Sequence, residues 1–145
     1  MTAAEYVVDV LGGPRVFKGR TVPTSFELRE RIKRGLPYLS LESVRERLRL
    51  TVPETATVLH MPPRTLARRR QSRKLDADES DRLYRIARVA AQAYGVFGEE
   101  DKAATWLARP NRALNGEVPI QLLDTDLGAR QVEDILGRIE HGVVG

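Results

Sequence analysis

The stretch from Thr51 to Leu75 constrains the fold most, because it holds two short helical segments separated by a break with two prolines. Thr51 and Glu54 have the Thr-x-x-Glu spacing of a capping box, which predicts the start of the first segment. Pro62 and Pro63 end it, and proline suits the first turn of a new helix because its missing N–H is not needed there. We therefore predict a helix, a tight turn and a second helix.

The second helix carries a run of basic residues. Six of the eleven residues from Arg64 to Lys74 are basic and none is acidic, which disfavours the alternative of an ordinary solvated face with acid–base pairs. Two short helices with a basic second helix are typical of a helix-turn-helix, whose second helix enters the major groove of DNA. His60 is interpreted as a turn residue, because histidine tolerates a left-handed backbone. The candidate DNA-binding residues are Arg64, Thr65, Arg68, Arg69, Arg70, Arg73 and Lys74.

Charge is distributed unevenly along the 145 residues, although the net charge is only +4. Residues 1–75 carry 16 Lys and Arg against 7 Asp and Glu, whereas residues 76–145 carry 8 against 13. A basic half followed by an acidic half indicates one surface for a polyanion and another for a different partner. We predict a partly irregular arm at 1–24, a helix-turn-helix domain at 25–76 and a second helical domain at 77–145.

Apolar periodicity predicts further helices and no strands. Ser25 and Ser40 are predicted to cap two helices, the first of which Gly35 ends. Asp76 and Glu79 form a second capping box, which opens the longest helix. Its apolar positions are Leu83, Ile86, Ala87, Ala90, Ala91 and Tyr94. The predicted class is all-α, with a helix-turn-helix domain followed by a small helical bundle.

The bundle is predicted to contain a helix near residues 99–108 and a last helix that starts at Thr125 or Asp126. Trp106, on the first of these, is expected to lie in the core. The last helix carries an apolar stripe that we expect to be fully packed. The stripe consists of Val132, Ile135, Leu136 and Ile139.

A helix-turn-helix usually reads two half-sites about one DNA turn apart, which predicts a homodimer. Its apolar interface is expected from Tyr6–Leu11, a segment that fits either a strand or a short helix, or from the long helix over Ala77–Tyr94.

Nothing in the sequence favours an enzyme. There is no cysteine, and the two histidines, His60 and His141, do not have a metal-binding spacing. No phosphate-binding glycine loop or Gly-x-Ser-x-Gly motif occurs, so we predict no catalysis, no metal and no cofactor. No apolar run is long enough to span a membrane, and no basic leader precedes the first apolar residues, so we expect a cytoplasmic protein.

The C-terminal residues resemble a known family. The motifs are Ala93–Gly98 (AYGVFG), Ala103–Leu107 (AATWL), Pro110-Asn111, Leu122–Thr125 (LLDT), and Arg138-Ile139 followed by Gly142. Together they resemble the toxin-binding domain of Xre-type antitoxins from bacterial RES–Xre toxin–antitoxin pairs. Upstream, Gly35-Leu36-Pro37 and Arg64–Arg69 (RTLARR) resemble the helix-turn-helix part of that family, so the likeness covers residues 32–145.

The resemblance implies a non-catalytic antitoxin that covers the active site of an NAD-consuming RES-domain toxin and represses its own operon by binding operator DNA. The homodimer predicted above is expected to belong to a larger toxin–antitoxin complex. The implied toxin-binding residues are Arg138, Glu140, His141, Gly142, Val143, Val144 and Gly145. Arg69 departs from the pattern, because a helix-turn-helix usually packs an apolar residue there. A stand-alone transcription regulator, whose C-terminal half dimerises or senses a ligand, is the alternative function.

Overall fold

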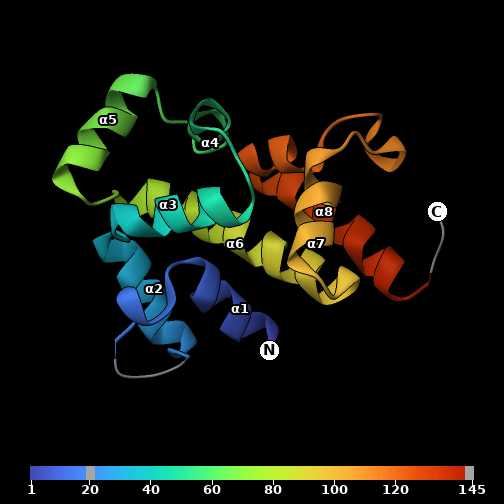
Figure 1. Ribbon diagram of the computed structural model, residues 1–145, viewed down its shortest axis with the longest axis horizontal. Helices are drawn as coiled ribbons and strands as arrows, with labels where there is room; N and C mark the ends of the chain where they lie inside the picture. The colour runs from blue at the N-terminus through green and yellow to red at the C-terminus, as the bar shows by residue number, and fades with distance from the viewer. Residues whose placement is uncertain (19–21, 143–145) are drawn as a thin grey trace.

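The computed structural model describes residues 1–18 and 22–142. Within these ranges the chain is helical and its only extended pairings are isolated bridges, so the predicted all-α class is confirmed. The α-helices are α1 (Ala3–Val10), α2 (Ser25–Arg34), α3 (Tyr38–Arg47), α4 (Val52–Val58), α5 (Pro63–Ser72), α6 (Ala77–Phe97), α7 (Glu100–Ala108) and α8 (Asp126–Glu140). Three 3-10 helices are η1 (Gly13–Arg15), η2 (Arg112–Leu114) and η3 (Pro119–Asp124). In Figure 1, α5 and the end of α8 lie at opposite ends of the molecule.

α6 is the central helix, and it packs against α1, α2, α3, α7, α8 and η3. The predicted capping box is confirmed, since Asp76 accepts from the N–H of Glu79 at 2.8 Å and Glu79 accepts from the N–H of Asp76 at 2.9 Å. The helix runs three residues beyond Tyr94 and ends at Gly98, whose φ of 76° is left-handed. Its buried positions include four alanines, which let neighbouring helices approach its backbone closely.

Helices from both halves of the sequence contribute to one hydrophobic core, which includes Tyr6 in α1 and Leu136 in α8. The predicted division at residues 76 and 77 coincides with the start of α6, yet α6 packs against elements on both sides of that point. No described helix is both long enough and apolar enough to cross a membrane.

The N-terminal segment is a helix rather than a strand. Thr2 and Glu5 form a capping box, with the Glu5 N–H donating to the Thr2 hydroxyl at 3.1 Å. Tyr6, Val10 and Leu11 are almost fully buried, and α1 packs against α6 and α3. The prediction that Tyr6–Leu11 offers spare apolar surface for a dimer is therefore wrong, because this surface is used inside the protein.

We predicted from its residue type that Ser40 caps α3, and the structure shows that it does not. The helix begins two residues earlier at Tyr38, after Pro37, and the Tyr38 N–H donates to the carbonyl of Arg73 at 3.0 Å. Ser40 is fully buried, and its hydroxyl donates to the carbonyl of Leu11 at 2.6 Å. A serine that is expected at a helix start thus ties α3 to the end of α1.

A cluster of charged and aromatic side chains joins α1, α3 and α7. The Arg47 guanidinium donates to Glu100 at 2.7 and 2.9 Å and to Asp9 at 2.9 Å. The Tyr6 hydroxyl donates to Glu100 at 3.0 Å, and its ring stacks on Tyr94 at 4.5 Å between centroids. The hydrogen bond from Arg47 holds the pKa of Glu100 below its ordinary value, whereas burial raises the pKa of Tyr6. We call Tyr6, Asp9, Arg47 and Glu100 the α1–α3–α7 clamp.

The clamp predicts a pH-dependent stability. Because the pKa of Glu100 is lowered in the folded state, its stabilising contribution is present above the ordinary glutamate pKa of about 4.3 and is lost as pH falls through the lower folded value. We expect Glu100→Gln to reduce the free energy of unfolding by about 1–2 kcal/mol at pH 7, and by less as the pH falls below about 4. Urea unfolding across this pH range measures the effect.

The matched control is Asp101→Asn, on the next residue of α7. Asp101 pairs with Arg49 but its side chain is 82% exposed, so its removal should change stability by less than about 0.5 kcal/mol. Equal losses in both variants at every pH would contradict the role assigned to the clamp.

Candidate DNA-binding and partner-binding surfaces

α4 and α5 form the predicted helix–turn–helix arrangement. Thr51 and Glu54 cap α4, since the Glu54 N–H donates to the Thr51 hydroxyl at 3.2 Å. Pro63 is the first residue of α5, as its proline chemistry predicted. His60 has a φ of 53°, which confirms it as a turn residue, and its Nε2 lies 2.6 Å from the carbonyl oxygen of Asp124. The turn is therefore held against the C-terminal half of the chain.

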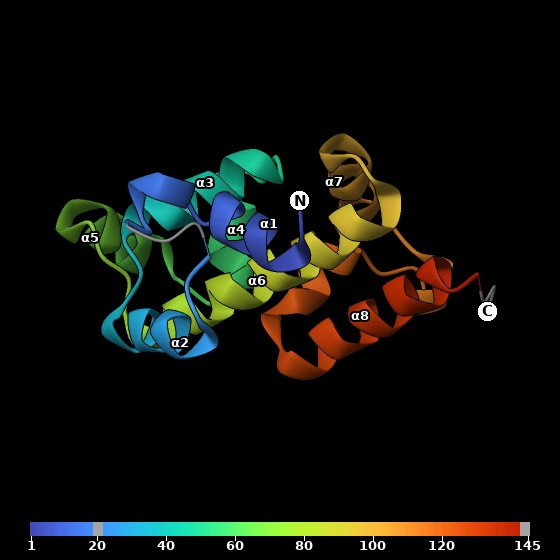
Figure 2. The same cartoon turned by 90° about the horizontal axis from the view of Figure 1, so that it is seen from below.

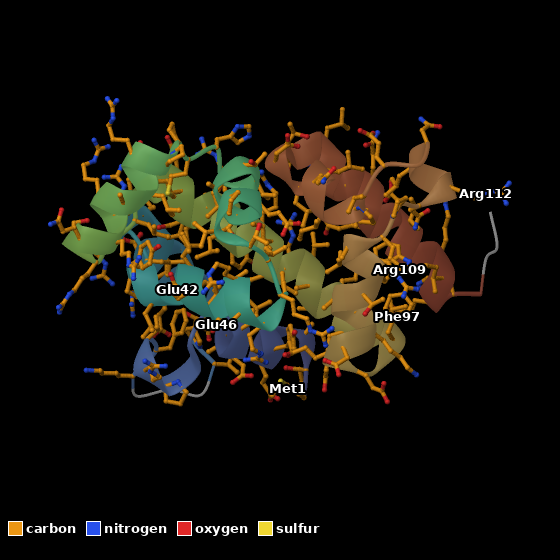
Figure 3. The ribbon with its side chains drawn as sticks, turned by 45° about the horizontal axis from the view of Figure 1, so that its top comes forward. Met1, Glu42, Glu46, Phe97, Arg109 and Arg112 are labelled. Carbon is orange, nitrogen blue, oxygen red and sulfur yellow. The ribbon has the colours of Figure 1, made fainter. Side chains whose placement is uncertain are left out.

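Most of the basic candidate residues are exposed on α5 or just beyond it. Arg64 and Arg68, four residues apart on one face of the helix, are both exposed, whereas Thr65 is half-buried. Leu66 is the buried residue of α5 and fixes which side faces the core. Side chains ending in nitrogen project from α5 away from the rest of the molecule (Figure 3).

The remaining basic candidates, Arg70, Arg73 and Lys74, lie at the end of α5 and just after it. Arg70 is exposed near the end of α5, and Arg73 follows the helix with a left-handed φ of 65°. Lys74 is exposed and its backbone forms a bridge with Pro37, at the start of α3. These three residues extend the basic surface from α5 toward the beginning of α3.

Arg69 differs from the other basic candidates, because the structure turns it inward. Its Nε donates to Glu79 at 2.7 Å and a second nitrogen donates to Asp76 at 3.1 Å. The side chain of Glu79 is only 6% exposed and that of Arg69 is 22% exposed. Arg69 thus occupies the position where a helix-turn-helix usually packs an apolar side chain, and Glu79 of α6 neutralises its charge there. Two of its three guanidinium nitrogens donate within the protein, so this side chain is less suited to contact DNA than its exposed neighbours.

Breaking this pair should destabilise the fold. Arg69→Met would leave the Glu79 carboxylate buried beside an apolar side chain, so we expect the free energy of unfolding to fall by about 2–4 kcal/mol at neutral pH. Arg68→Met, one residue earlier and exposed, should change it by less than about 0.5 kcal/mol. Thermal unfolding followed by circular dichroism compares the two. If both variants melt with the wild type, Arg69 has no structural role.

The sequence-predicted toxin-binding residues lie at the end of α8. Arg138, Glu140, His141 and Gly142 are exposed, and the φ of Gly142 is 71°. Arg138 also lines a groove of about 230 Å³ with Glu117 and Asp134. Val143, Val144 and Gly145 lie outside the described residues.

The apolar stripe of α8 is not fully packed, contrary to our prediction. Val132 and Leu136 are completely buried, and Ile135 is nearly so. Ile139, in the last turn of α8, is 42% exposed. One apolar side chain therefore remains on the surface beside the predicted partner-binding residues.

A second surface on the C-terminal half was not predicted from the sequence. A groove of about 670 Å³ lies along α7 and continues past its end to η2. Trp106, which we expected in the core, is half-buried and lines this groove with Phe97, the two ring centroids lying 5.8 Å apart. The signal in the sequence was the run Trp106–Arg112, in which an aromatic residue is followed by a helix stop and two arginines.

Comparisons with known proteins agree with both halves of this arrangement. Residues 27–88 match the family described as the antitoxin Xre-like helix-turn-helix domain, and residues 92–142 match the antitoxin Xre/MbcA/ParS C-terminal toxin-binding domain. The two matches meet inside α6. The fold and these matches define a two-part protein with a DNA-binding domain of the helix-turn-helix class.

Similar proteins and one solved structure show to which family within this class the chain belongs. An antitoxin Xre from Pseudomonas putida is 40% identical over 120 residues, covering 82% of this chain and 74% of the relative. An antitoxin Xre from Photorhabdus laumondii is 36% identical over 115 residues, covering 78% of each chain. A chain of the Mycobacterium tuberculosis MbcT–MbcA toxin–antitoxin complex superposes with a TM-score of 0.53 at 27% identity, covering 72% of this chain and 94% of that one. The chain belongs to the Xre family of antitoxins, as its residues had indicated.

Proposed function

We propose that this chain represses its own operon through α5 and neutralises a RES-domain, NAD-consuming toxin by covering the toxin's active site with its C-terminal region. The observation that carries the proposal is that two different candidate binding surfaces lie at opposite ends of the structure. An exposed basic helix of a helix-turn-helix lies at one end, and a domain matching the toxin-binding family lies at the other. The protein acts by binding and performs no catalysis of its own.

Operator recognition is assigned to the exposed basic residues of the first half. Arg64, Thr65 and Arg68 belong to the first two turns of α5, which in this motif reach base edges. Arg70, Arg73 and Lys74 are suited to phosphate contacts, because such contacts need exposed positive charge rather than exact direction. We leave Arg69 out of the contact set, since it pairs with Glu79. Reading two half-sites requires the homodimer that is part of this proposal.

We expect Arg64→Ala and Arg68→Ala each to weaken binding to the DNA upstream of this chain's own operon. A variant that loses a base contact should cost about 1–3 kcal/mol and relax specificity, whereas one that loses a phosphate contact should reduce the salt slope by about one. Fluorescence anisotropy at several salt concentrations separates the two. Arg130→Ala, an exposed arginine of α8, is the control. Unchanged affinity in both α5 variants would show that DNA is read elsewhere.

Toxin neutralisation is assigned to Arg138 and to residues 140–145. Deleting residues 142–145 should leave folding and operator binding intact, because α5 and the buried part of α8 do not contain them. It should abolish protection of cells that express the toxin from the adjacent reading frame. Colony growth during co-expression measures this loss. Full protection by the shortened chain would place the inhibitory surface elsewhere on residues 96–139.

A further inference from the structure

We propose that the groove along α7 and η2 holds the toxin by packing an apolar side chain of the toxin against the paired rings of Phe97 and Trp106 and binding an adjoining carboxylate with Arg109 and Arg112. The role of the groove rests on the proposed function, because the occupant is a surface segment of the same toxin. It adds a second contact to the residues at the end of α8, one that holds the partner in place rather than covering its active site.

α7 presents two different faces. Ala103, Ala104 and Leu107 are buried against the rest of the protein. Trp106 is half-buried on the groove side, where its ring and that of Phe97 are tilted by 40° to each other. Tryptophan is one of the residue types that most often dominate binding to another protein, and exposed apolar surface in a groove often marks an interaction site. The groove is therefore an apolar recess open to a partner.

The positive charge of two arginines at the groove determines which chemical group a partner must present there. Arg109 and Arg112 are exposed, and among the described residues neither has an ion-pair partner. In contrast, Asp101 at the groove pairs with Arg49, and Lys102 lies 3.6 Å from Glu99. The two unpaired arginines belong to the half of the chain in which acidic residues outnumber basic ones. A carboxylate is the complementary group, since a guanidinium binds it through two parallel hydrogen bonds.

The loop that carries the arginines is held in one shape. Pro110 stops α7, so Arg109 leaves the helix in an extended conformation. The side chain of Asn111 accepts from the N–H of Ala113 at 2.9 Å, and its backbone N–H donates to the carbonyl of Glu117 at 3.0 Å. In Figure 3, Arg109 lies between Phe97 and Arg112 along one edge of the molecule. A fixed loop binds more tightly than a mobile one because less conformational freedom is lost.

The position of the groove fits a shared partner. α7 and the end of α8 lie at the same end of the molecule, and α5 lies at the other end (Figure 2). One toxin molecule can therefore contact both the groove and the residues after Ile139 while α5 is free to bind DNA.

The test uses the full chain and the purified protein encoded by the adjacent reading frame. We expect the double variant Arg109→Glu, Arg112→Glu to lose about 100-fold or more in affinity, because two attractive contacts become repulsive. Arg130→Glu, which reverses an exposed arginine on α8, should stay within about threefold of the wild type, since exposed rim charges contribute little. Unchanged operator affinity and melting temperature show that the variants are folded. Thr105→Tyr fills the groove without changing charge and should also weaken binding.

A second measurement places the partner at the groove directly. Trp106 is the only tryptophan of the chain, so incorporation of 5-fluorotryptophan gives one ¹⁹F resonance. That resonance should shift or broaden when the adjacent-frame protein is added and stay in place when operator DNA is added.

The outcomes separate the two proposals. If the wild-type chain does not bind the adjacent-frame protein, the proposed function fails and the groove proposal fails with it. If the wild type binds and the arginine double variant binds within threefold of it, the groove proposal is overturned and the proposed function stands, whatever the resonance does.

Discussion

The burial of α6 on nearly all sides is the constraint on which the rest of the structure depends. Its middle turns carry Ala87, Ala90, Ala91 and Ala93, all essentially inaccessible to solvent. Side chains this small bring the surrounding helices close, which a run of larger residues would prevent. Because helices from both ends of the chain pack on this one element, the basic face of α5 and the candidate surfaces of the C-terminal half are parts of a single packed body.

Polar contacts along α6 reinforce this arrangement. The hydroxyl of Ser80 accepts from the N–H of Leu36 at 2.7 Å, and Arg82 donates to the carbonyl of Leu59 at 3.1 Å. Further along, Arg85 donates to the carbonyl of Leu123 at 3.1 Å. These side chains satisfy backbone groups at the ends of other elements, where helical hydrogen bonds run out. The central helix therefore fixes both the start of α3 and the turn before α5, and with them the direction of the basic surface.

The features that could be read from the sequence are those set by neighbouring residues. Capping boxes at Thr51 and Asp76 and the left-handed turn at His60 depend on local backbone chemistry, and the structure contains them all. The misplaced features depend on distant partners. Ser40 looks like a helix cap until the carbonyl of Leu11 is brought to it, and Trp106 looks like a core residue until α7 is placed with one side outward.

Arginine count alone also overstates the basic surface. Arg47 is engaged by Asp9 and Glu100, and Arg69 by Glu79, so neither contributes free charge to the basic half. These ion pairs could not be predicted from the sequence, because Asp9 and Glu100 lie far from Arg47 along the chain and Glu79 was assigned only as part of a capping box. The basic residues of α5 and those just after it, apart from Arg69, are exposed and form a run with no acidic residue among them, which makes this run the best candidate surface for DNA.

The α1–α3–α7 clamp connects the DNA-binding half of the chain to the helix that lines the groove. Arg47 is the last residue of α3, in the DNA-binding half, and Glu100 is the first residue of α7, the helix that forms the groove. Two sites influence each other only when a connecting element has two arrangements that their ligands favour unequally. Here the connection is one set of short, part-buried hydrogen bonds between the end of α3 and the start of α7. A partner bound in the proposed groove would affect the proposed DNA binding only to the extent that it moved α7 against α3, and with the clamp intact the chain presents both surfaces at once.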